Sequence, residues 1–293
     1  MRGPVNASGG RSIMILVTTA GKVGSETARL LAKREVPVRV LVRDAEKAKV
    51  LADAGAEIAV GDLAIRASID EAMAGVTGVV LVSPAVPAQE LNVIASAARA
   101  GVGHVVKASS KASADSPIAR RRWQAEIEAG LAASGVPHTL LRSNAYMHNV
   151  LALAPAIANT GGFGSSAGKG QIGMVDARDV AAVAAAIATS PAPRVGKTYW
   201  LTGPELISYY DVAAVLSRLL GRTITYRELT FDQDKGAMIR AGVPEQIAEM
   251  NAQAASLTAD GDAAWVTGDV TSLLNRPARS FDEFAADYAN AFS

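Results

Sequence analysis

A short glycine-containing loop is the first place where this sequence could do chemistry. Residues 13–24 read IMILVTTAGKVG, an apolar run followed by small residues, and the helix-forming segment ETARLLAK comes next. In a parallel α/β sheet such a turn holds a dinucleotide pyrophosphate, because small residues admit the phosphates and the helix N-terminus offers free N–H groups. The usual pattern is G-x-x-G-x-x-G, and Thr18 stands at its first glycine here. The loop residues that we expect to contact a cofactor are Thr18, Thr19, Ala20, Gly21, Lys22, Val23 and Gly24.

A basic residue stands where such a fold selects between two dinucleotides. Nineteen residues after Gly24, at the end of the apolar run VRVLV, the sequence has Arg43. An acidic residue at this point binds a ribose hydroxyl, whereas an arginine accommodates a 2′-phosphate. The loop and Arg43 together favour NADP(H), and the alternative is a solvated arginine at a strand end. We expect Asp44 to cap the next helix rather than bind ribose, while Lys22 either meets a phosphate or faces water.

Alternating strand and helix signals place these residues in a Rossmann sheet. The predicted strands cover 13–18, 37–42, 57–60, 78–83, 103–108 and 137–142, with further strands at 197–203 and 223–229. The predicted helices cover about 23–35, 44–54, 66–74, 88–101, 117–134, 176–189, 208–220, 231–240, 244–254 and 281–292. Short apolar runs that alternate with helices are typical of an α/β, doubly wound parallel sheet.

The pattern changes near residue 150 and predicts a smaller, mostly helical C-terminal substrate domain. We expect residues 12–150 and 174–203 to form the NADP-binding Rossmann domain, and 151–173 and 204–293 to form the smaller one. Residues 1–11 are polar and glycine-rich, as in a disordered extension. The glycine- and serine-rich segment 159–171 is either a surface loop or hairpin, or a mobile lid.

Composition excludes several classes of function. Of the 293 residues, 49% are hydrophobic and 19% are charged, and the net charge of +1 gives no footprint for nucleic acid. The chain has no cysteine and only three histidines, far apart in sequence, so we expect no metal site. No apolar stretch reaches the roughly 18 residues of a membrane span. We therefore expect a cytoplasmic protein that acts on a small molecule, with a homodimer left open.

Several segments carry a resemblance to a known family. They are TTAGKVG, Arg43, GDL at 61–63, VVKASS at 105–110, ASGVPHTLLRSNAYMHN at 133–149, VDARDVAAV at 175–183 and LTGPE at 201–205. In this combination the chain resembles the NmrA-like proteins, which are atypical short-chain dehydrogenase/reductases, and among them the bacterial NADPH:quinone oxidoreductases. The resemblance covers nearly the whole chain from residue 13.

The resemblance implies where a cofactor and a substrate lie. It implies NADP(H) in the crevice at the strand ends, in contact with loop residues 18–24, Arg43, Asp62, Leu63, Ser83, Pro84, Lys107 and Asn144. It also implies a substrate pocket near Asn144, Tyr146 and Asn149, and we predict that His148 lines the same pocket. Lys107, at the end of the fifth strand, either bonds the nicotinamide ribose or extends its ammonium group to solvent.

The usual proton donor of the wider superfamily is missing. None of the six tyrosines is followed four residues later by lysine, so the Tyr-x-x-x-Lys pair of carbonyl reduction is absent. Many NmrA-like relatives carry a histidine where this chain has Gln124, and a glutamine cannot exchange a proton near neutral pH. The candidate catalytic residues are therefore Ser109 and Gln124, which can bond a substrate oxygen, and Tyr146, which can stack on a ring or donate its hydroxyl. Alternatively, Ser109 caps a loop and Tyr146 is only a wall residue.

Two functions fit these features, and a third is weaker. The first is an NADPH-dependent reductase of quinone-like or polycyclic aromatic compounds, as a tailoring step in aromatic metabolism whose reduced product could go on to react with oxygen. The second is an NADP(H)-binding redox sensor that acts through a protein partner. An epimerase is disfavoured because no acid–base pair is evident. We expect His148 to line the pocket rim or the surface rather than catalyse, and the arginines at 120–122 to form a solvated helix face rather than bind a phosphate or a partner.

Overall fold

The computed structural model describes residues 13–293, so the predicted N-terminal extension lies outside the described residues. A seven-stranded, wholly parallel sheet has the order β3-β2-β1-β4-β5-β6-β8. Its strands are β1 (Ile15–Val17), β2 (Val38–Val42), β3 (Glu57–Val60), β4 (Gly78–Leu81), β5 (His104–Ser110), β6 (His138–Ser143) and β8 (Thr198–Leu201). The order reverses between β1 and β4, which confirms the doubly wound prediction and opens a crevice at the strand carboxyl ends.

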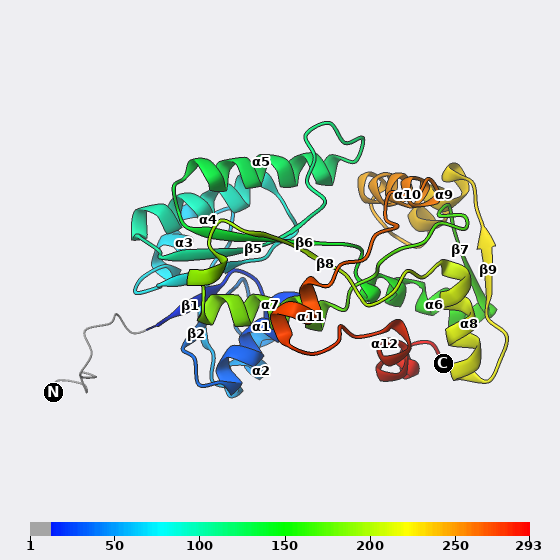
Figure 1. Cartoon of the computed structure of the whole chain (residues 1–293), viewed down its shortest axis with the longest axis horizontal. Coiled ribbons are helices and arrows are strands. Elements are labelled where there is room, and N and C mark those ends of the chain that lie inside the picture. The colour runs from blue at the N-terminus through cyan, green and yellow to red at the C-terminus, as the bar shows by residue number, and fades with distance from the viewer. Residues whose placement is uncertain (1–12) are drawn as a thin grey trace.

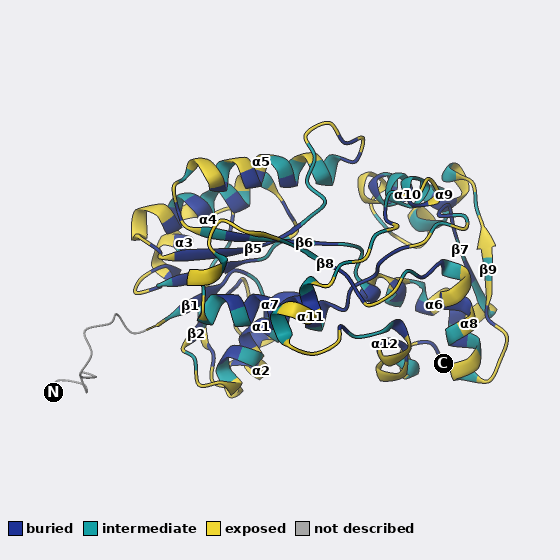
Figure 2. Ribbon diagram, viewed as in Figure 1, coloured by how far each residue is buried: buried dark blue, intermediate teal, exposed yellow. Residues whose placement is uncertain are grey.

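Helices cover both faces of this sheet (Figure 1). On one face lie α3 (Arg66–Ala72), α4 (Pro87–Ala100) and α5 (Ala119–Ala133), and on the other lie α1 (Lys22–Lys33), α2 (Lys49–Asp53), α7 (Ala177–Thr189) and α11 (Asp269–Leu274). The central strands β1, β4 and β5 are buried between the two layers, whereas the edge strands β3 and β8 are partly exposed (Figure 2). Each layer has its own core, with Leu31 and Val180 in one and Ile94 and Ile127 in the other.

A smaller unit caps the carboxyl end of the sheet (Figure 1). It contains the helices α6 (Ala154–Thr160), α8 (Tyr209–Leu220), α9 (Phe231–Arg240), α10 (Glu245–Ala259) and α12 (Phe281–Asp287), and the parallel strand pair β7 (Gly162–Ser165) and β9 (Thr225–Glu228). The core of the smaller unit contains Met147, Phe163, Leu216 and Phe284. In the chain as a whole, short 3-10 helices span Glu46–Ala48, Met147–Leu153, Ala192–Arg194 and Ala289–Ala291.

Two sequence predictions about this unit need correction. The segment 159–171 is neither a hairpin nor a free loop, because residues 162–165 form β7 beside β9 and Phe163 is buried in the core. This strand could not be recognised from the sequence, because two of its four residues are glycines and so show no alternation of apolar and polar side chains. The predicted domain division also misses a return of the chain to the sheet: α11 packs on α7 and β8, with Val270 in the sheet core.

Across residues 13–293, no helix combines the length and the apolar character that crossing a membrane requires. Within the same residues, no group of three or more histidine or acidic side chains is arranged to hold a metal ion.

Candidate functional site

A single large cavity of about 2360 Å³ runs from the carboxyl ends of the strands into the smaller unit. Its lining contains nearly all of the residues that the sequence suggested, from both the predicted cofactor set and the predicted substrate set. They are Thr18, Thr19, Ala20, Gly21, Lys22, Val23, Arg43, Asp62, Leu63, Ser83, Pro84, Ser109, Gln124, Asn144, Tyr146, His148 and Asn149. Gly24 and Lys107 do not line it.

The loop between β1 and α1 is held by the two threonines in place of the missing glycine. The Thr18 hydroxyl donates to the Val82 carbonyl at 2.7 Å and accepts from the Val82 N–H at 2.9 Å, and Thr19 donates to the same carbonyl at 3.0 Å. The Thr18 side chain thus links the end of β1 to the end of β4, a contact that a glycine at this position could not make. Gly24 is required for a different reason, because a Cβ there would lie 1.9 Å from the Thr19 carbonyl oxygen.

The N-terminus of α1 is open to an anion. Its N-cap is Gly21, no side chain caps it, and its first turn contains no acidic residue. The free N–H groups and the helix dipole therefore present uncompensated positive potential on the cavity wall. Lys22 adds its charge at the same place.

Arg43 lies on the cavity wall and is free to bind a ligand. Its side chain is exposed, and no described residue forms an ion pair or a side-chain hydrogen bond with it. Asp44 is already engaged, because its carboxylate accepts from the Glu46 N–H at 3.1 Å and pairs with Lys47 at 3.5 Å. The expectation that Asp44 is the N-cap of the next helix is wrong, because Ala45 and Ala48 are the N-caps of the two helical pieces that follow, and neither has a side-chain cap bond. Asp62 is similarly engaged, since its carboxylate accepts from the Ala64 N–H at 2.8 Å.

Lys107 does not fill the role that the resemblance implied. Its ammonium group is fully buried and pairs with the equally buried Glu90 of α4 at 3.0 Å. Glu90 in turn accepts from the Ser83 hydroxyl at 2.6 Å. Lys107 is the fourth of the seven residues of β5, so it lies below the carboxyl end of the strand, and its side chain points to α4. It is therefore beneath the wall of the cavity. It supports the segment around Ser83 and does not reach a ligand.

Ser109 and Gln124 meet at the wall, and a carboxylate binds the serine proton. The Ser109 hydroxyl lies 2.6 Å from Glu128 Oε1 and 3.1 Å from the Gln124 side chain. Glu128 also pairs with Arg142, with Nε at 3.2 Å from Oε1. A hydroxyl has one proton to donate, and the Glu128 carboxylate, which also pairs with Arg142, is the nearer and stronger acceptor. Ser109 and Gln124 can therefore orient a ligand but hold no proton ready for transfer.

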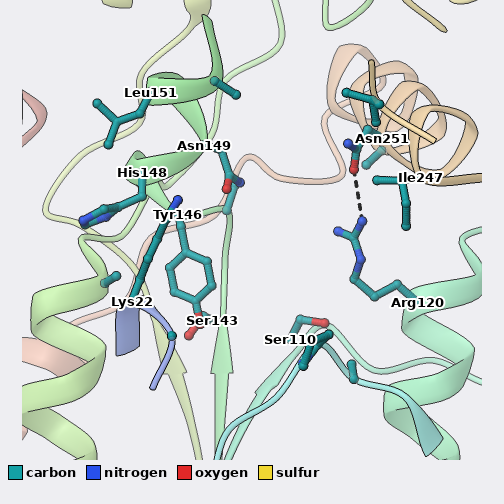
Figure 3. A pocket seen from close by; sticks show the side chains of 18 of the residues that line it. Lys22, Ser110, Arg120, Ser143, Tyr146, His148, Asn149, Leu151, Ile247 and Asn251 are labelled. Carbon is teal, nitrogen blue, oxygen red and sulfur yellow. Dashed lines mark hydrogen bonds between the residues drawn. The ribbon is translucent and has the colours of Figure 1, made fainter. Parts of the chain in front are cut away.

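Tyr146 and His148 lie together beside Lys22 (Figure 3). The Tyr146 hydroxyl points toward Ser143, and burial raises the pKa of this phenol, an effect that Ser143 partly opposes. His148 bonds Tyr288 through Nε2 at 3.1 Å and packs edge-on against Phe284. Burial lowers the pKa of His148, with Lys22 and Arg178 adding to the decrease and Asp176 opposing it. The Tyr146 phenol and the His148 imidazole are thus both neutral near pH 7. Asn149, beside them, is exposed.

Asn144 is on the wall, but its amide is already bonded. It donates to the Ala263 carbonyl at 3.0 Å and accepts from the Ala145 N–H at 2.8 Å. These bonds fix the end of β6 to the segment 263–265. Asn144 therefore shapes the cavity wall, and its amide already has these bonds in the absence of a cofactor.

The prediction for the three consecutive arginines is wrong in part. Arg122 is exposed as expected, but Arg120 and Arg121 line the cavity. Arg121 pairs with Asp262 at 2.5 Å, and Lys111 pairs with the same carboxylate at 2.6 Å. Sequence reasoning could not find this corner, because Asp262 is 141 residues from Arg121 along the chain.

The apolar part of the cavity was also missed. It comes from the smaller unit, where large side chains from several elements face the space above the strand ends. They include Leu151, Phe163, Met238, Ile247 and Trp265. No periodicity distinguishes such wall residues from core residues, so they could not be recognised from the sequence.

A family model described as the NmrA-like family matches residues 11–285. The chain belongs to this family. Its NmrA-like fold is shared with the solved structure of an NADPH-dependent quinone oxidoreductase from Escherichia coli complexed with NADPH. The two match with a TM-score of 0.85 and 31% identity, over 94% of this chain and 100% of the other.

Two curated proteins extend the comparison. This NmrA-like chain is 37% identical over 284 residues to the NAD(P)H azoreductase of Xenophilus azovorans, and the match covers 96% of this chain and 99% of that protein. It is 40% identical over 287 residues to the (4-alkanoyl-5-oxo-2,5-dihydrofuran-3-yl)methyl phosphate reductase of Streptomyces griseus. This match covers 96% of this chain and 99% of that protein.

Proposed function

We propose that this chain transfers hydride from NADPH to a quinone-like or polycyclic aromatic acceptor. It is an NADPH-dependent oxidoreductase: its nearly full-length relatives are named as reductases or oxidoreductases, one with NADPH and one with NAD(P)H in the name. The observation that carries the proposal is the continuity of one cavity, which joins the β1–α1 loop and Arg43 to an apolar chamber.

The residues present fit NADP(H). The tight loop that Gly24 permits and the uncapped start of α1 suit a pyrophosphate, and Arg43, which pairs with no described residue, suits a 2′-phosphate. When bound, NADPH supplies a hydride from its nicotinamide ring. The chain supplies position and excludes water.

The state of the surrounding protons selects the kind of acceptor. Tyr146 has a raised pKa, the Ser109 proton is bonded to Glu128, and His148 is neutral and bonded to Tyr288. None of these groups is a ready acid near pH 7. An acceptor that can take its proton from water is therefore favoured, and a quinone qualifies: with one hydride and one solvent proton it becomes a hydroquinone.

The chamber walls favour a flat, extended ring system. Phe163, Met238 and Trp265 offer aromatic and flexible apolar surface. The relatives are named for the reduction of azo compounds and quinones, which are conjugated acceptors. A biosynthetic tailoring step on an aromatic metabolite is the use that we propose for this activity.

The test is the loss of NADPH absorbance with menadione, 1,4-naphthoquinone, an azo dye and a polycyclic aromatic ketone, each with and without oxygen. Acceptor-dependent oxidation supports the proposal, and oxygen uptake after reduction supports follow-on oxygen chemistry. Tight NADPH binding without oxidation across the panel contradicts it and favours the redox sensor. A sensor must bind NADPH and NADP⁺ with different affinities, since equal affinities shift no equilibrium.

A further inference from the structure

Arg120, a cation on the wall of the apolar chamber, forms no ion pair with an acidic residue within residues 13–293. Arg120 extends from the start of α5 into the cavity and meets α10 across it (Figure 3). Its side-chain hydrogen bond within residues 13–293 goes to the neutral Asn251 Oδ1, at 3.0 Å. A guanidinium has five N–H donors, so most of the donors of this cavity-lining residue have no partner among the described residues.

The neighbouring charges do not neutralise Arg120. Arg121 and Lys111 share the single carboxylate of Asp262. This corner of the cavity therefore carries three cations and one acid. Burial, reinforced by Arg121, lowers the pKa of Arg120 below its ordinary value. A half-buried guanidinium without a carboxylate is costly to maintain, and an anionic ligand would remove that cost.

The position of Arg120 separates it from the groups that suit the cofactor. Arg43 and the start of α1 follow β2 and β1, whereas Arg120 follows β5. Two strands, β1 and β4, separate β2 from β5 in the sheet order. Arg120 also contacts α10, which supplies Ile247 to the apolar wall. It is thus placed at the substrate end of the cavity.

We propose that Arg120 recognises an anionic oxygen group, a carboxylate or a phosphate, on the acceptor, so that the enzyme prefers acidic acceptors to neutral ones with the same rings. This inference rests on the proposed function and adds a specificity-determining residue to it. A planar guanidinium can hold either oxyanion through two parallel hydrogen bonds.

The test measures binding, so that it does not depend on turnover. The NADP⁺-loaded protein is titrated calorimetrically with 2-naphthoate, 2-naphthyl phosphate and the neutral 2-naphthalenemethanol. We expect at least one anion to bind the wild type about 10- to 100-fold more tightly than the alcohol, as for one charge-assisted contact. The anion that gains more identifies the group that the site takes.

Variants on the same helix assign the effect. Arg120→Gln should abolish the preference while leaving the affinity for the alcohol within about twofold, and Arg120→Lys should keep part of it. Arg122→Gln removes the same charge from an exposed position two residues away and should leave the preference unchanged. The alcohol therefore reports any general damage to the chamber.

The outcomes separate this inference from the proposed function. Equal wild-type affinity for all three compounds, or a preference that survives Arg120→Gln, overturns the role of Arg120 even if quinones are reduced. A preference that depends on Arg120 in a protein that reduces no quinone supports anion recognition and contradicts the reductase.

Discussion

Replacing Arg43 with alanine should change the choice between NADPH and NADH. NADH differs only in lacking the 2′-phosphate, so a residue that binds this phosphate should affect NADPH alone. Arg43 lines the cavity, and no described residue pairs with it. Its removal therefore breaks no internal ion pair, and the loss of affinity reports the ligand contact directly.

The magnitude follows from the exposure of Arg43. A hydrogen bond to a charged group contributes about 1.5–3 kcal/mol net, whereas a fully exposed ion pair contributes about 0–1 kcal/mol. Arg43 is exposed but lies on the wall of a concave site, so we take about 1.5–2 kcal/mol. This corresponds to a loss of NADPH affinity of roughly 10- to 30-fold. The affinity for NADH should change by less than about twofold.

The assay is a fluorescence titration of both cofactors at one fixed ionic strength. Lys47→Ala is the matched control, because Lys47 is a cation on the same wall that already pairs with Asp44. It should weaken NADPH only slightly. If Arg43→Ala weakens NADPH and NADH by the same factor, Arg43 does not bind the 2′-phosphate and the cofactor preference has another source.

Three further predictions follow from the structure. Gly24→Ala places a Cβ 1.9 Å from the Thr19 carbonyl, so urea denaturation should show a loss of about 1–3 kcal/mol together with weaker NADPH binding; unchanged values would mean that the loop adjusts freely. Tyr146→Phe should leave the pH dependence of kcat unchanged between pH 6 and 9, because burial keeps the pKa of this phenol above its ordinary value; a lost pH inflection would make Tyr146 a proton donor. Burial, with His138 adding to it, lowers the pKa of His104 to about 4, so the unfolded chain takes up a proton first as the pH falls below about 6.5. The stability that neutral His104 confers is therefore lost between about pH 6.5 and 4, by about 2 kcal/mol at pH 5. Urea midpoints at pH 7 and 5 should converge in His104→Gln, and an identical pH effect in both proteins would disprove this origin.

The sheet could be predicted because its signals are local. Each strand is a short apolar run, each helix has its own period, and the loop with Gly21 and Gly24 lies within one βα unit. The parallel order then follows from the rules for crossovers. The position of Arg43 on the same cavity wall as the loop could be predicted as well, because the carboxyl ends of the strands of a parallel sheet meet at one edge.

The chamber could not be predicted because its contacts are distant in sequence. The pairs Arg121–Asp262 and Arg120–Asn251 join segments more than 100 residues apart. Lys107 shows a related difficulty: the sequence placed it at the end of the fifth strand, but β5 continues to Ser110, and Lys107 is buried in mid-strand against Glu90. The strand end, and with it the residues that reach the cavity, depends on pairing between strands that are distant in sequence.

The central claim is that hydride passes directly from NADPH to an acceptor held in the same cavity. The most direct measurement mixes the NADPH-loaded protein with 1,4-naphthoquinone in an anaerobic stopped-flow instrument, using NADPH deuterated at either face of the nicotinamide C4. The account predicts a protein-dependent loss of NADPH absorbance that saturates with quinone and is slowed by deuterium at one face only. A rate equal to that of free NADPH and quinone, or no loss at all, would contradict it.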